Sequence, residues 1–128
     1  MSGTALILAA HGSRVDPTIS EQLRDYADRI VRLNLFDEVA VAFHRGLPTF
    51  AGVLDQLQAD DVVVVPVMTS DGYYCDVVLP QELAKNQRFT QVRLRQTPPV
   101  GAHAGAIALV ERRARRLILD HNLEAEDV

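Results

Sequence analysis

The 128-residue sequence contains a single cysteine, Cys75. One cysteine cannot form an internal disulfide bond, and such sparing use of cysteine suits a reducing compartment. The N-terminus has no basic stretch before its apolar run, and no apolar run reaches the length of a membrane span. We therefore expect a soluble, cytoplasmic protein that does not associate with membranes.

Several motifs that bind nucleotides or carry hydrolytic nucleophiles are also missing. Neither Gly-x-x-x-x-Gly-Lys nor Gly-x-Gly-x-x-Gly follows the first apolar run, so a nucleotide would find no phosphate-binding loop. The nucleophile elbow Gly-x-Ser-x-Gly is absent, and Ala10 precedes His11 where a histidine phosphatase would carry arginine. Cys75 is followed by Asp76, and a neighbouring carboxylate disfavours a thiolate nucleophile. These absences predict that no nucleotide cofactor is used.

Positive charge is scarce: thirteen Lys and Arg stand against seventeen Asp and Glu, for a net charge of −4. This balance argues against a general nucleic-acid-binding protein held by phosphate contacts. Only the stretch "ERRARR", residues 111–116, is strongly basic. Its arginines mostly occupy the polar positions of an amphipathic segment over 104–119, so we interpret them as a solvated helix face.

Four short apolar runs alternate with longer segments of helical periodicity, without a repeat, low-complexity tract or linker. The predicted strands cover 5–10, 39–43, 62–68 and 92–94 with its flanks. The first three lack polar alternation, as expected for parallel strands that are covered on both faces. The valine run of the third strand is poor helix material and suits the centre of a sheet.

The intervening segments predict helices over 16–33, 47–57, 78–86 and 102–122. Strands and helices that alternate in this way form a parallel sheet with right-handed crossovers. The sequence therefore predicts a single α/β domain over residues 1–128, a three-layer αβα sandwich around a four-stranded, mainly parallel sheet of the flavodoxin-like type.

Side chains that can bind metal ions or transfer protons follow these strands at their carboxyl ends. His11, His44 and His103 follow the first, second and fourth strands, and the third is followed by "MTSDGYYCD". Open α/β sheets bind ligands at this edge. Imidazole is a common ligand of Fe, Co, Ni and Zn, and it also takes up a proton near pH 7. Metal handling and acid–base catalysis therefore both remain open.

The stretches "LILAAHGSR", "VAFHRGLPTF", "DDVVVVPVMTSDGYYCDVVLP" and "TPPVGAH" occur in this order between Leu6 and His103. Together they resemble the small CbiX-type sirohydrochlorin chelatases, the class II chelatases of sirohaem and cobalamin synthesis. The resemblance implies half of a chelatase-like fold and a homodimer. It also implies ATP-independent insertion of a divalent Co, Fe or Ni ion, itself a substrate, into a tetrapyrrole.

The resemblance makes His11 the first metal ligand. Tyr74 stands where the second metal-binding histidine of the family is expected, so we expect His44 or His103 to supply an imidazole and Asp71 a carboxylate. The candidate catalytic residues are thus His11, His44 and Asp71, with His11 and His44 as metal ligands. The candidate substrate-binding residues are Ser13, Arg14, Arg45, Ser70, Tyr74 and His103, the arginines as partners of substrate carboxylates.

Three functions remain open from the sequence. The first is a divergent chelatase that uses the residues named above. The second is a tetrapyrrole-binding or metal-binding homologue without efficient insertion, acting as a carrier or assembly subunit. The third is a flavodoxin-like module that binds a small anion at the turn over residues 12–14 and the following helix N-terminus.

Overall fold

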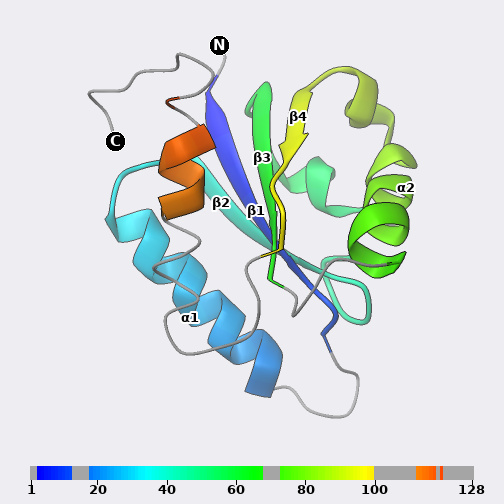
Figure 1. The fold of residues 1–128 in the computed structure, drawn as a ribbon, viewed down its shortest axis with the longest axis horizontal. Coiled ribbons are helices and arrows are strands. Elements are labelled where there is room, and N and C mark those ends of the chain that lie inside the picture. Colours follow the sequence, from blue (N-terminus) through cyan, green and yellow to red (C-terminus); the bar gives the residue numbers. More distant parts are fainter. Residues whose placement is uncertain (1–2, 13–17, 68–72, 100–111, 118, 120–128) are drawn as a thin grey trace.

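Four parallel strands form the centre of the protein in a computed structural model, which describes residues 3–12, 18–67, 73–99, 112–117 and 119 (Figure 1). The strands are β1 (Thr4–Ala10), β2 (Glu38–Phe43), β3 (Asp61–Pro66) and β4 (Arg93–Gln96). Their order is β2-β1-β3-β4, and every neighbouring pair is parallel. The predicted α/β class and parallel sheet are confirmed.

Helices cover both faces of the sheet, which gives the three predicted layers (Figure 1). On one face, α1 (Thr18–Arg32) packs Leu23, Ala27 and Ile30 against the sheet. These residues are spaced four and three apart, and so form one apolar stripe. On the other face lie the 3₁₀ helix η1 (Val53–Gln56), the π-helix η2 (Tyr74–Val78) and α2 (Leu79–Ala84). A second 3₁₀ helix, η3 (Gln87–Thr90), leads into β4.

The prediction of a helix over 47–57 is wrong for most of that segment. The backbone N–H of Phe43 donates to the carbonyl oxygen of Pro48 at 2.9 Å, and Thr49 forms an isolated parallel bridge with Phe43. These contacts hold residues 48–49 beside the end of β2, so the chain turns before the short helix η1 begins at Val53. The apolar residues of this segment are nevertheless buried: Phe50, Val53 and Leu54 are 1% or less exposed and Leu57 is 5% exposed.

The helices predicted over 78–86 and 102–122 differ in how far the structure describes them. The helix predicted over 78–86 corresponds to α2, which continues directly from the π-helix η2. The helix predicted over 102–122 falls largely on residues outside those described, although 112–117 are helical and Leu117 packs on the α1 face. Of the helices that the structure describes, none is long and apolar enough to cross a membrane.

Arg88 of η3 forms hydrogen bonds to the backbone in and beside η1. Its guanidinium donates to the carbonyl oxygens of Leu54, at 2.6 Å, and of Leu57 and Ala59. Asn86 is buried beside it and donates to the carbonyl oxygen of Ala51 at 3.0 Å. These side chains supply donors to carbonyl groups in and beside the short 3₁₀ helix, where the Leu54 carbonyl oxygen also accepts from the Leu57 N–H.

Replacing Arg88 with alanine is expected to lower the free energy of unfolding by about 2 kcal/mol, because partly buried carbonyl groups lose a charged donor. Urea denaturation measures this change. Arg93→Ala is the matched control: its guanidinium is 66% exposed and lies 3.5 Å from an Asp61 oxygen. An exposed ion pair of this kind contributes less than about 1 kcal/mol. Equal losses in both variants would contradict the role assigned to Arg88.

Candidate metal and tetrapyrrole site

The carboxyl ends of β1 and β2 continue side by side beyond the strands. The backbone N–H of His44 donates to the carbonyl oxygen of Ala10 at 3.0 Å, and that of Arg45 donates to the carbonyl oxygen of His11 at 2.7 Å. Parallel pairing therefore places His11 and His44 on neighbouring strand ends, as the sequence predicts.

This close approach requires glycine after His11. Gly12 has a φ of +72°, and a Cβ atom there would lie 2.4 Å from the carbonyl oxygen of Arg45. A side chain at this position would collide with the backbone that carries His44. Gly12 thus permits the two histidines to lie next to each other.

Three aromatic rings converge at this edge of the sheet. The ring centroids of His11 and His44 are 6.3 Å apart. The ring of Tyr74 lies 4.4 Å from His11 and 5.1 Å from His44, in edge-to-face geometry with both. We call His11, His44 and Tyr74 the edge cluster. His44 is partly buried and also lies 6.0 Å from the ring of Phe50, while His11 and Tyr74 are more exposed.

The spacing of the two imidazoles is compatible with a shared metal ion. An ion bound at roughly 2.1 Å from one nitrogen of each ring would place the ring centroids roughly 5 Å apart at a tetrahedral angle and roughly 6.5 Å apart when the two bonds are nearly in line. The separation of 6.3 Å lies near the second value, so tetrahedral binding needs a movement of about 1 Å by the imidazoles. Within the described part of the chain, no group of three or more His, Cys, Asp or Glu residues is arranged to hold a metal ion. Two imidazoles are therefore the donor set that the described residues offer.

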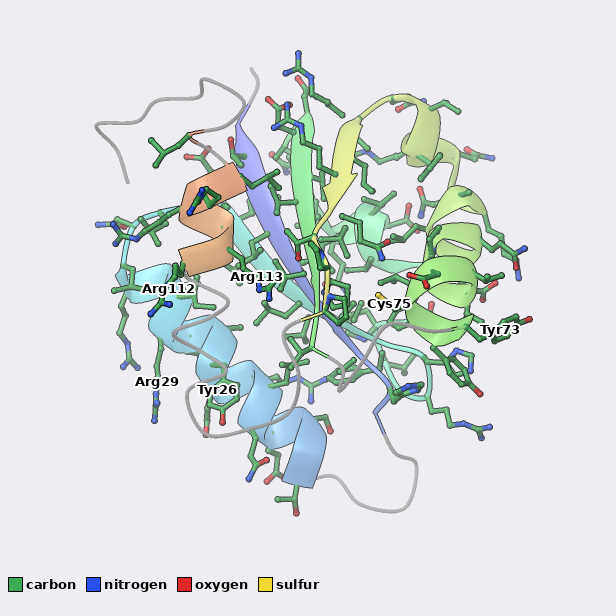
Figure 2. All side chains as sticks on the ribbon, viewed as in Figure 1. Tyr26, Arg29, Tyr73, Cys75, Arg112 and Arg113 are labelled. Carbon is green, nitrogen blue, oxygen red and sulfur yellow. The ribbon has the colours of Figure 1, made fainter. Side chains whose placement is uncertain are left out.

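Tyr74 reaches the cluster from the first turn of η2. The next residue, Cys75, is 2% exposed and belongs to the core under the sheet. Gln96, at the end of β4, donates to the Cys75 carbonyl oxygen at 2.8 Å, which ties η2 to the sheet. The thiol is thus a packing group, as its sequence context suggests. Tyr73 is 67% exposed and its ring lies 5.9 Å from that of Tyr74, on the α2 side of the protein (Figure 2).

Two supporting residues were not found from the sequence. Arg24 of α1 donates to the carbonyl oxygen of Leu47 at 2.8 Å, and its guanidinium lies 5.4 Å from the centre of the Phe43 ring. It thereby holds the loop that begins at His44 against α1. Phe50 is buried, and its ring packs 6.0 Å from that of His44. Neither contact has a local signal, because each joins residues that are distant or separated by an irregular turn.

The pKa of His11 is lowered from its ordinary value of 6.5. Partial desolvation by the surrounding groups is the largest cause, and positive charge on His44 and Arg45 adds to it. The charged imidazolium is disfavoured by both effects. His11 therefore keeps the neutral form that binds a metal ion to lower pH than an isolated histidine would.

NMR titration of the metal-free protein is expected to give His11 a midpoint below 6.5. In His44→Ala this midpoint should move upward, because a positive charge and part of the desolvation are removed. The sign for stability follows from linkage. As the pH falls below 6.5 the unfolded chain takes up a proton on His11 before the folded protein does, so stability decreases. A midpoint at or above 6.5 in the parent protein would contradict this interpretation.

The remaining candidates divide into two groups. Arg45 is exposed, and its charge acts on His11, so it lies near the edge cluster; its role in substrate binding stays a prediction. The other candidates lie outside the described residues, and the structure places none of them: Ser13, Arg14, Ser70, Asp71 and His103. The anion-binding turn considered over residues 12–14 falls mostly in the same undescribed stretch.

The sequence also matches known proteins. Residues 5–117 match the family CbiX. A protein of Halobacterium salinarum described as a probable sirohydrochlorin cobaltochelatase is 43% identical over 79 residues, which are 62% of this chain. Those residues make up only 27% of the length of that relative.

Two solved structures share the fold. A multi-domain protein of Deinococcus radiodurans, described as structurally similar to chelatases with two additional novel domains, aligns over 88% of this chain and 28% of its own. Its TM-score is 0.69 and its identity 28%. A candidate cobalamin (vitamin B12) biosynthesis CbiX protein of Marinobacter aquaeolei aligns over 92% of this chain and 98% of its own, with a TM-score of 0.61 and 20% identity. The match to the family over most of the sequence, together with this shared fold, shows that the chain belongs to the CbiX family.

Proposed function

We propose that this chain inserts a divalent metal ion, Co(II) or Fe(II), into sirohydrochlorin or a closely related tetrapyrrole. The observation that carries the proposal is the edge cluster itself: His11 and His44 meet at the ligand-binding edge of the sheet in a member of the CbiX family. The name of the Halobacterium relative favours cobalt as the metal. Imidazole binds Fe, Co and Ni alike, so the donor set does not choose among them.

Metal insertion exchanges one divalent ion for two pyrrole protons. Bonds form between the ion and the ring nitrogens, two N–H bonds break, and two protons must be accepted. In our proposal His11 and His44 hold the ion through neutral imidazole nitrogens and present it to one face of the macrocycle. As the ion leaves, each imidazole regains a lone pair that can accept a proton. The lowered pKa of His11 favours the metal-binding form at the start of this exchange.

The surroundings of the edge cluster suit a flat substrate with acidic substituents. Tyr74 and Tyr73 are 39% and 67% exposed. The Tyr74 ring offers apolar surface beside the imidazoles, and the Tyr73 ring lies 5.9 Å from that of Tyr74. Aromatic rings of this kind stack on or pack edge-on against a macrocycle. In our proposal the exposed Arg45 pairs with a substrate carboxylate. We include Ser13, Arg14, Ser70, Asp71 and His103 in the proposed site, from the sequence alone.

A second function, a carrier that binds the tetrapyrrole or the metal without efficient insertion, is favoured by one observation. Tyr74 fills the position beside both imidazoles, and a neutral phenol is a poor ligand for a divalent ion. A carrier would bind sirohydrochlorin but release it without metal.

Absorbance spectroscopy under anaerobic conditions separates the two functions. The protein is mixed with sirohydrochlorin and Co(II), and the spectrum of the metallated product is followed. A chelatase is expected to exceed the protein-free rate at least about tenfold, corresponding to about 1.4 kcal/mol of transition-state stabilisation. His11→Ala should remove most of this acceleration. No acceleration with Co(II), Fe(II) or Ni(II) would overturn the chelatase proposal, and failure to bind the tetrapyrrole would overturn the carrier as well.

We also propose that two copies of the chain together enclose the substrate. Leu47 is 76% exposed in the loop after His44, and Tyr73 is similarly exposed after β3. Large apolar side chains at the rim of a site are candidates for burial by a partner. Light scattering of the purified chain is expected to give the mass of a dimer, and a monomer mass at micromolar concentration would contradict this part of the proposal.

A further inference from the structure

A hollow of about 500 Å³ lies apart from the edge cluster, between the end of β4 and the helical residues 112–117. Its walls include Gln96, Thr97, Arg112, Arg113, Arg116 and Leu117. Figure 2 shows Arg112 and Arg113 over the α1 face of the sheet, whereas Tyr73 lies on the α2 side. The hollow and the edge cluster are therefore separate places in the fold.

Three arginines line the hollow, which an interpretation as a solvated helix face does not explain. Arg112 and Arg116 are exposed, as the sequence predicts, but Arg113 is partly buried. Its Nε–H is buried and has no hydrogen-bond partner. The ion pairs of Lys85 with Glu82 and of Arg93 with Asp61 involve none of these three arginines, and within the described part of the chain no carboxylate pairs with them.

Other polar groups at the hollow are already engaged. The Thr97 hydroxyl donates to the carbonyl oxygen of Pro98 at 3.0 Å. The amide of Gln96 donates to the carbonyl oxygen of Cys75. Binding capacity in the hollow therefore resides in the guanidinium groups, whose planar arrays of N–H donors match carboxylate and phosphate oxygens.

We infer that this hollow, which we call the arginine pocket, is a binding site for a small anion with two or more carboxylate or phosphate groups. Three neighbouring positive charges repel one another, and a multivalent anion would remove that repulsion while accepting the buried Nε–H of Arg113. The volume falls in the range of small-molecule sites, roughly 300–1,000 Å³. The inference does not rest on the proposed chelatase function.

Isothermal titration calorimetry of the full chain with citrate and, separately, with pyrophosphate tests the inference. The titrations use about 0.15 M NaCl, so that the added anion changes the ionic strength little. The ligand stays at millimolar concentration, where exclusion of these salts from the protein surface has little effect on stability. Saturable binding of one anion per chain is expected, and the relative affinities show whether carboxylate or phosphate is preferred. Arg116→Gln and Arg113→Met should each weaken binding at least about tenfold, equal to about 1.4 kcal/mol. The control Arg29→Gln, on the exposed side of α1, should bind as the parent does.

Two further measurements make the assignment specific. Arg113→Met keeps the apolar length of the side chain and deletes the unsatisfied Nε–H, so the ligand-free melting temperature should stay the same or rise. A clear fall would mean that Arg113 stabilises the fold through neighbours, which would overturn the inference. His11→Ala should bind the anion as the parent does, and loss of binding in this variant would place the anion at the edge cluster instead. Absence of saturable binding of both anions to the parent would also overturn the inference.

Discussion

Tyr74→His is expected to tighten the binding of Co(II) at least about tenfold, which corresponds to about 1.4 kcal/mol. The Tyr74 ring lies within 4.4 Å of the His11 ring and 5.1 Å of the His44 ring, centre to centre. A third imidazole at this position can join the two already present on one ion, because histidine is a far better ligand than a neutral phenol. Titration followed by the visible absorption of bound Co(II) measures the change.

The neighbouring tyrosine provides the matched control. Tyr73 belongs to the same turn and is 67% exposed. Among the described residues its ring lies beside that of Tyr74, at 5.9 Å, and not beside either histidine. Tyr73→His should therefore leave the affinity within about twofold of the parent value, a difference of about 0.4 kcal/mol. Equal gains in both variants would show that an added histidine anywhere on this surface is enough, and would contradict the placement of Tyr74 at the metal.

Gly12→Ala should be the most damaging small substitution for stability. The left-handed φ of +72° costs an L-residue about 1–2 kcal/mol, and the new Cβ would lie 2.4 Å from the Arg45 carbonyl oxygen. Because this contact is with backbone, relief requires β1 and β2 to separate at their ends. We expect a loss of about 3 kcal/mol or more in the free energy of unfolding, measured by urea denaturation.

Gly52→Ala is the control, which shows whether replacing any glycine with alanine destabilises the protein to the same extent. Gly52 lies at the start of η1 with a φ of −101°, and a Cβ there would lie 3.2 Å from the hydroxyl oxygen of Thr49. Gly52→Ala should stay within about 1 kcal/mol of the parent, since alanine also restricts the unfolded chain. If Gly12→Ala were as mild, the tight pairing of the two strand ends would be contradicted.

Much of the sheet could be predicted because its signals are local. Four consecutive valines, Val62 to Val65, are 2% or less exposed at the centre of the sheet, and an unbroken apolar run is the mark of a strand covered on both faces. The carboxyl edge of a parallel sheet then follows from topology alone. For this reason the sequence predicts His11 and His44 at the same edge of the sheet.

Predictions failed where a distant contact decides the local structure. The segment 47–57 has an acceptable helical pattern, but the bond from Phe43 N–H to Pro48 keeps its start beside β2. The hydrogen bond from Arg24 to the Leu47 carbonyl oxygen is likewise a contact between distant residues that no local pattern predicts. The arginine pocket was missed because the helical pattern gives the polar face of residues 112–116 but not the strand end that faces Arg113.

Binding of Co(II) to the metal-free protein, followed by visible absorption, tests most directly whether His11 and His44 together hold the metal. Four proteins are compared: the parent, His11→Ala, His44→Ala and His121→Ala, the last altering a histidine near the C-terminus. The account predicts that the parent binds one ion saturably. The affinity should fall at least about tenfold in His11→Ala and in His44→Ala, a loss of about 1.4 kcal/mol each, and should be unchanged in His121→Ala. Binding of equal strength in the parent and His11→Ala would contradict it.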